Sequence, residues 1–161
     1  MADLNISIQE SITLPNRNKV NTFNNKIITD VNQITHRVDT IATTFEETGI
    51  EILRFVDSEE KQTAGSFVRD AVKYIRITNI DSTNFCTLYL IKTDLDNALF
   101  KLDPGKSMMF ANASFDSNNS QDYVQVGYLD EQYFSSFTTI DVIKAKADTA
   151  NIQLDIFVGS S

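Results

Sequence analysis

The chain has 161 residues, and its hydrophobic content of 42% suits a single globular domain with its own core. Its formal net charge of −8 disfavours phosphate backbones and anionic lipids as partners. A single cysteine excludes an intramolecular disulfide, and no apolar run is long enough to span a membrane. We therefore expect synthesis and folding in a cytoplasm, without nucleic-acid or membrane binding.

The N-terminal segment alternates apolar with polar residues, which predicts an extended strand. Its apolar positions are Leu4, Ile6, Ile8, Ile12 and Leu14. Residues 15–26 are rich in asparagine and predict an exposed connection. These patterns divide the chain into an N-terminal strand or arm with its connection, residues 1–26, and a β-sandwich domain, residues 27–161.

Residues 27–45 carry two conflicting patterns. Apolar residues recur at helical spacing, at Val31, Ile34, Val38 and Ile41. Threonines crowd the same span, and β-branched residues favour strands. Good helix formers are missing from the polar positions, so we favour extended structure, with a helix as the alternative. Residues 50–56 predict a further strand, and residues 57–70 predict a polar loop with at most one helical turn.

Residues 72–91 contain two runs of β-type residues around the polar turn 79–84, which predicts a β-hairpin. Ile75 and Ile77 are expected to face the core, and Cys86 lies on an apolar strand face where a core position is expected. An aromatic and arginine cluster on a sheet suits an interface hot spot, and it is equally common as ordinary strand decoration. The residues of this cluster are Tyr74, Arg76 and Tyr89.

The second half of the chain continues the pattern of short strands and polar turns. Asp103-Pro-Gly-Lys106 predicts a type II turn, because proline presets its own φ and glycine accepts a positive φ. Strands are predicted over residues 98–102, 107–110, 123–129, 138–145 and 152–158, with a polar loop over 111–122. The whole pattern predicts an all-β fold, an antiparallel β-sandwich that is jelly-roll-like, with an extended N-terminal strand or arm.

The chain offers no strong catalytic or metal-binding motif. Gly105-Lys106-Ser107 resembles the end of a phosphate-binding loop, but Phe100 stands where that loop needs a glycine. Residues 116–122 place oxygen-bearing side chains at every second position, as a calcium loop does, but its required glycine and glutamate are replaced. His36 has no second histidine for a metal site. We expect a non-enzymatic protein without cofactor, metal or catalytic residues.

Several segments resemble small virion structural proteins of tailed phages of marine bacteria. The resemblance covers residues 4–158 and is carried by patterns of strands and turns. Its segments are Ile6-Ser-Ile-Gln-Glu-Ser-Ile-Thr-Leu14, Lys73-Tyr-Ile-Arg-Ile-Thr-Asn-Ile-Asp-Ser-Thr-Asn84, Lys101-Leu-Asp-Pro-Gly-Lys106 and Leu154-Asp-Ile-Phe-Val158. It implies a non-enzymatic component of a virus particle and supplies no catalytic residues.

The expected role is a capsid decoration or cement subunit in the virion. Such a subunit would be a homo-oligomer that binds the major capsid protein and neighbouring copies through β-strand and apolar contacts. The expected interface residues are Leu4, Ile6, Ile8, Ile12, Leu14, Tyr74, Arg76 and Tyr89. Two alternatives stay open: a neck or tail ring component, and a glycan- or receptor-binding module that stacks its ligand on tyrosines.

Overall fold

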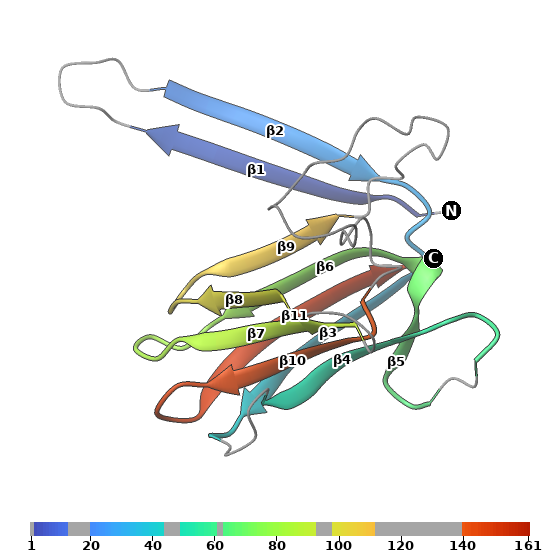
Figure 1. Cartoon of the computed structure of the whole chain (residues 1–161). Helices are drawn as coiled ribbons and strands as arrows, with labels where there is room; N and C mark the ends of the chain where they lie inside the picture. Colours follow the sequence, from blue (N-terminus) through green and yellow to red (C-terminus); the bar gives the residue numbers. More distant parts are fainter. Residues whose placement is uncertain (1, 13–19, 44–48, 61–62, 93–97, 112–139) are drawn as a thin grey trace, which may run out of the picture.

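The computed structural model describes residues 2–12, 20–43, 49–60, 63–92, 98–111 and 140–161, and within them the chain is almost entirely β-structure (Figure 1). The strands form two packed sheets and a separate two-stranded hairpin. The predicted all-β sandwich is therefore confirmed. The described part contains one short 3₁₀ turn, Arg69–Ala71, and no helix that is long and apolar enough to cross a bilayer.

Two sheets make the sandwich. The five-stranded sheet contains, in spatial order, β5 (Ser66–Val68), β4 (Ile50–Val56), β10 (Val142–Ala147), β7 (Cys86–Ile91) and β8 (Ala98–Leu102). The four-stranded sheet contains, in spatial order, β3 (Gln33–Ile41), β11 (Ile152–Ser160), β6 (Val72–Asn79) and β9 (Ser107–Ala111). Every pairing within them is antiparallel except the short parallel contact between β4 and β5.

The strand pairs are nested along the chain, which identifies the winding of a jelly roll. β7 pairs with β8, β6 with β9, β4 with β10 and β3 with β11. The chain thus forms one long antiparallel ribbon whose two halves wrap around the core together. Each pair lies in the opposite sheet from the pair before it, so the connections from β3 to β4, β6 to β7 and β8 to β9 all cross between layers.

The hairpin predicted over residues 72–91 is wrong. Both strands exist, but β6 pairs with β11 and β9 in one sheet, whereas β7 pairs with β10 and β8 in the other. The turn between them therefore bridges the two layers instead of joining neighbours in one sheet. Alternation of apolar residues showed which side chains share a face, but it contains no information about which strand lies alongside.

The N-terminal strand is confirmed as β1 (Leu4–Ile12), and Leu14 lies outside the described residues. Its partner is β2 (Val20–Ile28), which runs antiparallel with Leu4 opposite Ile28 and Ile12 opposite Val20. The connection predicted over residues 15–26 is therefore wrong from residue 20 onward. Asparagine disfavours strands in general, but here it is tolerated by direct cross-strand bonding, since Ser7 Oγ donates to Asn25 Oδ1 at 2.9 Å.

Other local predictions have mixed outcomes. Extended structure is confirmed for β3, and the helical alternative is excluded there. The loop predicted over residues 57–70 contains strand β5 and the 3₁₀ turn. The turn at Asp103–Lys106 is confirmed, with Gly105 at φ +69° and Lys106 N–H donating to Asp103 O at 3.1 Å. The possible calcium loop, and the strand predicted over 123–129, lie outside the described residues.

The core fills the space between the two sheets. Its largest fully buried side chains include Ile75 and Ile77 of β6, which confirms their predicted inward position, and Leu154 and Ile156 of β11. The five-stranded sheet faces them with Leu88, Ile143 and the fully buried Cys86. Desolvation raises the pKa of the Cys86 thiol to about 12, because burial disfavours the charged thiolate.

Asn79 is a fully buried polar residue at the crossing between layers. Its side-chain Nδ2 donates to Asn84 O at 2.8 Å and to Leu102 O at 3.1 Å, and its Oδ1 accepts from Asp81 N–H at 3.0 Å. Gly105 N–H donates to Asn79 O at 2.8 Å. The side chain of Asn79 therefore ties the β6–β7 turn to β8, and its backbone carbonyl adds a link to the β8–β9 turn.

Replacing Asn79 should destabilise the fold strongly. Asn79→Ala would leave two buried carbonyls and one N–H without their partner, so we expect a loss of about 2–4 kcal/mol in the free energy of unfolding. Urea titration followed by circular dichroism measures this loss. Ser82→Ala, in the same turn but exposed, is the control and should change stability by less than about 0.5 kcal/mol. Equal effects of both variants would contradict the assigned role of Asn79.

The Cys86 thiol should stay unmodified in the folded protein. Its folded pKa lies above the unfolded value, so the neutral thiol contributes stability that is complete below about pH 8.5 and is lost as the pH rises toward about 12. At pH 8, a thiol reagent such as DTNB should react with the chain in urea and not with the native protein. Stoichiometric reaction under native conditions would contradict this placement.

Candidate interaction surface

One surface of the four-stranded sheet faces away from the core, and we call it the outer face. The strand register places its residues side by side, because Phe157 lies opposite both His36 and Arg76, and Arg76 lies opposite Met109. Its described side chains come from four strands and are Ile34, His36, Val38, Asp155, Phe157, Tyr74, Arg76, Thr78, Ser107 and Met109.

The contacts that the structure describes fasten the β1–β2 hairpin to the outer face at the end that holds Leu4 and Ile28. Leu4 and Ile6 of β1 pack against a small buried group made by hairpin and sheet residues. The set, which we call the anchor cluster, consists of Leu4, Ile6, Ile28, Val31, Tyr74 and Phe157. Val31 N–H also donates to Ala2 O at 3.0 Å, which closes the base of the hairpin. From this end the hairpin extends away from the sandwich (Figure 1).

Gly159 permits this close approach. A Cβ atom at position 159 would lie 3.2 Å from Val31 Cγ1 and 3.6 Å from Leu4 Cδ2. The first distance is shorter than an ordinary carbon–carbon contact, so a side chain here would push the hairpin base outward. Because Gly159 has no side chain, the base of the hairpin can pack directly against β11 at this position.

Phe157 is the centre of the outer face. The Tyr74 ring meets it edge-on at a centroid distance of 5.9 Å, and the His36 ring is tilted at 5.9 Å. Arg76 Cζ lies 5.6 Å from the Phe157 ring centroid, within reach of a cation–π contact. Burial raises the pKa of Tyr74, with the charge of Arg76 acting in the opposite direction.

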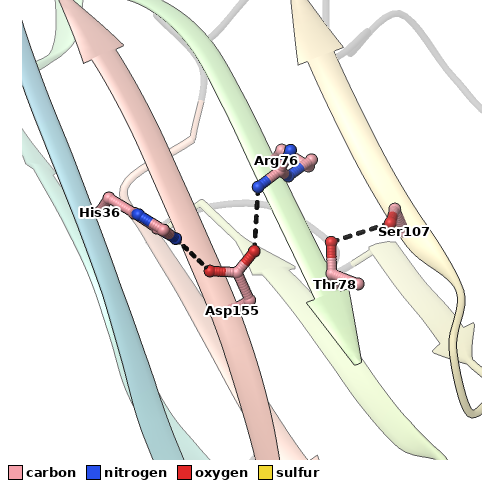
Figure 2. A network of polar contacts seen from close by, with 5 residues as sticks. All are labelled: His36, Arg76, Thr78, Ser107 and Asp155. Carbon is pink, nitrogen blue, oxygen red and sulfur yellow. Dashed lines mark hydrogen bonds and ion pairs between the residues drawn. The ribbon is translucent and has the colours of Figure 1, made fainter. Parts of the chain in front are cut away.

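Asp155, two residues before Phe157 on β11, joins two basic side chains, as Figure 2 shows. Its Oδ1 is 2.5 Å from His36 Nε2, and Arg76 Nη2 donates to its Oδ2 at 2.9 Å. Each carboxylate oxygen therefore has its own partner, so the carboxylate links β11 to both neighbouring strands, β3 and β6. Farther along, the Thr78 and Ser107 hydroxyls bond to each other at 2.8 Å and link β6 to β9.

The structure does not bring the predicted interface residues together in one place. Leu4, Ile6 and Tyr74 are spent on the anchor cluster, where Tyr74 is only 5% exposed. Ile8 and Arg76 keep surface on the hairpin and the outer face. Ile12 belongs to β1, whereas Leu14 lies outside the described residues. Tyr89 is on β7, so it points outward from the other sheet and is not brought together with Tyr74.

The far side of the five-stranded sheet is more basic than the whole chain suggests. Lys144 lies opposite Tyr89 and Glu51, and Lys146 and Lys101 each lie opposite Thr87. Arg54 Nε donates to Glu51 Oε1 at 2.9 Å, and this bond raises the Arg54 pKa. An acidic chain thus gathers several cations on one sheet surface.

Sequence reasoning missed the members of the surface that lie on β11. Asp155 and Phe157 stand at the outward positions of a clearly alternating strand, and a phenylalanine at an outward position was the available signal. Gly159 gave no such signal, because its role depends on a hairpin that returns from the other end of the chain. Among the described residues no group of three or more acidic, histidine or cysteine side chains is placed to hold a metal ion.

No protein-family model, no curated protein and no solved structure matches this chain.

Gly159→Val should loosen the hairpin and leave the sandwich folded. The added side chain would overlap Val31, and overpacking of this kind costs about 1–3 kcal/mol, which falls on the hairpin contact. Hydrogen exchange should accelerate in β1 and β2 while β6 and β7 stay protected. Gln153→Val, on the same strand and exposed, is the matched control and should leave exchange in the hairpin unchanged. Unchanged protection of the hairpin in Gly159→Val would contradict the role of Gly159 in the packing of the hairpin base.

Proposed function

We propose that this chain is a virion structural protein of a tailed phage, and that it decorates the capsid by binding the major capsid protein and neighbouring copies. The observation that carries the proposal is the β1–β2 hairpin, which is anchored at one end and exposes Ile8 (41%) beyond the anchor and Ile27 (60%) on the reverse face of the anchored end. These two isoleucines lie on opposite faces of the hairpin, because Ile8 shares the face of Leu4 and Ile6, whereas Ile27 lies opposite Asn5.

A two-stranded hairpin in water is marginally stable unless another surface covers it. Within the described residues, the anchor cluster covers only its base, and β1 and β2 pair with no other strand. Both edges therefore offer unpaired backbone groups, and a docking partner would gain main-chain hydrogen bonds as well as apolar contacts. This favours a hairpin that is completed by binding.

The chemistry of the hairpin suits a protein partner. Its two strands contain one acidic and one basic residue, Glu10 and Lys26, among isoleucine, asparagine, serine and glutamine. The rest of the chain is strongly acidic and keeps the unbound protein soluble. The jelly-roll winding is compatible with a capsid role, since viral capsid domains use it, although the same fold also occurs in lectins and cupins. The resemblance of the chain to small phage virion proteins is the second support.

The proposal predicts that the chain is present in purified particles of the phage that encodes it. Quantitative mass spectrometry should find it in a fixed ratio to the major capsid protein. A shell subunit would be present in many copies per particle, because the capsid repeats its binding site by symmetry. A neck or tail ring would contain only the few copies of one cyclic symmetry. A low, ring-like copy number would support the neck alternative, and absence from particles would refute the virion role.

The hairpin itself is tested by the double variant Ile8→Asp, Ile27→Asp. Both side chains are outside the buried core, so the fold should persist, while binding to particles that lack the protein should fall roughly tenfold or more. Co-sedimentation measures the binding. Ser58→Asp with Thr63→Asp adds the same charge to exposed positions near β5 and should bind like the parent chain. Equal loss in both would contradict the role of the hairpin.

A further inference from the structure

Strand β3 leaves one edge of the sandwich open. It has nine residues, and within the described part of the chain it pairs only with β11. The other edge strands of the two sheets are shorter, with three residues in β5 and five each in β8 and β9. Short edges are a common protection against pairing with other chains, and β3 lacks that protection.

Proline and bulges, two further protections of edge strands, are also missing from this edge. β3 contains no proline, and its pairing with β11 runs without a bulge from Gln33 to Ile41. Arg37 and Asp39 point inward, where they neutralise each other through an Arg37 Nε to Asp39 Oδ2 bond of 2.8 Å. Arg37 also donates to Ile52 O on the other sheet. Inward-pointing charges are themselves an edge protection, but this pair is satisfied within one chain, and no other described strand pairs with the outer backbone edge of β3.

The outward side of β3 is apolar around a central histidine. Ile34 is 57% exposed and Val38 is 53% exposed, with His36 midway between them. A strand with this pattern is complementary to itself when it is turned around. In an antiparallel pair centred on His36, Ile34 of each chain lies directly opposite Val38 of the other, and both apolar residues gain a cross-strand partner.

We propose that β3 binds the β3 of a second copy in antiparallel register about a twofold axis at His36. The two four-stranded sheets then become one continuous sheet of eight strands, and the contact is isologous. On the inward side, Thr35 lies opposite the second copy's Arg37, and Gln33 lies opposite its Asp39. Arg37 and Asp39 thus each meet an uncharged side chain, and His36 is the one ionisable residue of β3 that lies opposite its own copy.

Other registers fit less well. An axis at Arg37 sets the two Arg37 side chains against each other, and like charges directly opposite are destabilising. An axis at Thr35 sets Ile34 against His36 and Val38 against Asn32. An axis at Val38 sets Ile34 opposite Ala42, which lies beyond the end of β3. It also sets Arg37 opposite the second copy's Asp39, but these two residues already bond to each other within each chain.

The contact goes beyond the decoration role, because it forms between two copies in solution and needs no particle. It also uses a different part of the molecule from the hairpin, whose anchor rests on Tyr74 and Phe157. Failure of the hairpin variants to affect particle binding would leave the β3 contact standing, and the reverse also holds.

Cysteine cross-linking tests both the contact and its register. Directly opposite residues have Cβ atoms about 4.5–5.5 Å apart, near the span of about 3.5–4.5 Å that a disulfide needs. The native Cys86 is buried and supplies no background. Under mild oxidation, His36→Cys should form a disulfide-linked dimer as its main product. A mixture of Ile34→Cys with Val38→Cys should also cross-link.

The controls come from the same strand. Ile34→Cys alone and Val38→Cys alone should stay uncrosslinked, because each residue would lie four positions, about 13 Å, from its own copy. Light scattering of the parent chain should give twice the mass of one 18.1 kDa chain, and Ile34→Glu should give the single mass with an unchanged circular dichroism spectrum. A parent chain that stays monomeric, with no cross-linked His36→Cys, overturns the contact. Stronger cross-linking of Val38→Cys than of His36→Cys overturns the register.

Discussion

Burial of apolar side chains between two wound sheets is the interaction on which the rest of this structure depends. Ile75, Ile77 and Ile156 from one sheet meet Leu88 and Ile143 from the other. The chain can fill this space from both sides only by crossing between layers at its turns. Each crossing carries backbone groups through an apolar environment, where unpaired N–H and C=O groups are costly. Asn79 meets that requirement at the β6–β7 crossing.

The outer face of the four-stranded sheet is covered in one part and exposed in another. The outer face is covered at the anchor cluster by the hairpin, and Gly159 sets how closely the hairpin approaches. Asp155 bonds two basic side chains on the uncovered remainder, beside the exposed apolar residues Ile34, Val38 and Met109. The hairpin and β3 share one property: each presents apolar side chains beside free backbone edges. Both features suit contacts made by strand addition, and neither depends on the net charge of the chain.

Much of the fold could be predicted from local patterns, because burial against one face imposes a period of two on each strand. The alternation in β11 and β6 predicted both strands and their inward residues correctly. Strand partners could not be predicted, since β6 and β7 would show the same alternation in one sheet or in two. The burial of Tyr74 could not be predicted from the sequence for a similar reason. Its strand position is correct, but its burial depends on Leu4 and Ile6, which are distant in sequence and return to it through the hairpin.

The nested winding also orders the events by which a newly made chain completes its fold. β7 and β8 lie close in sequence and close a short loop, whereas Ile41 must find Ile152 across nearly the whole sandwich. Loop closure over such a span is slow, so β11 is expected to join its sheet late in folding. Phe157 and Gly159 belong to β11, so the base of the hairpin cannot pack against the sheet before that strand is in place. Immature chains would therefore lack the fixed arm, and the docking that we propose for it would have to wait until folding is complete.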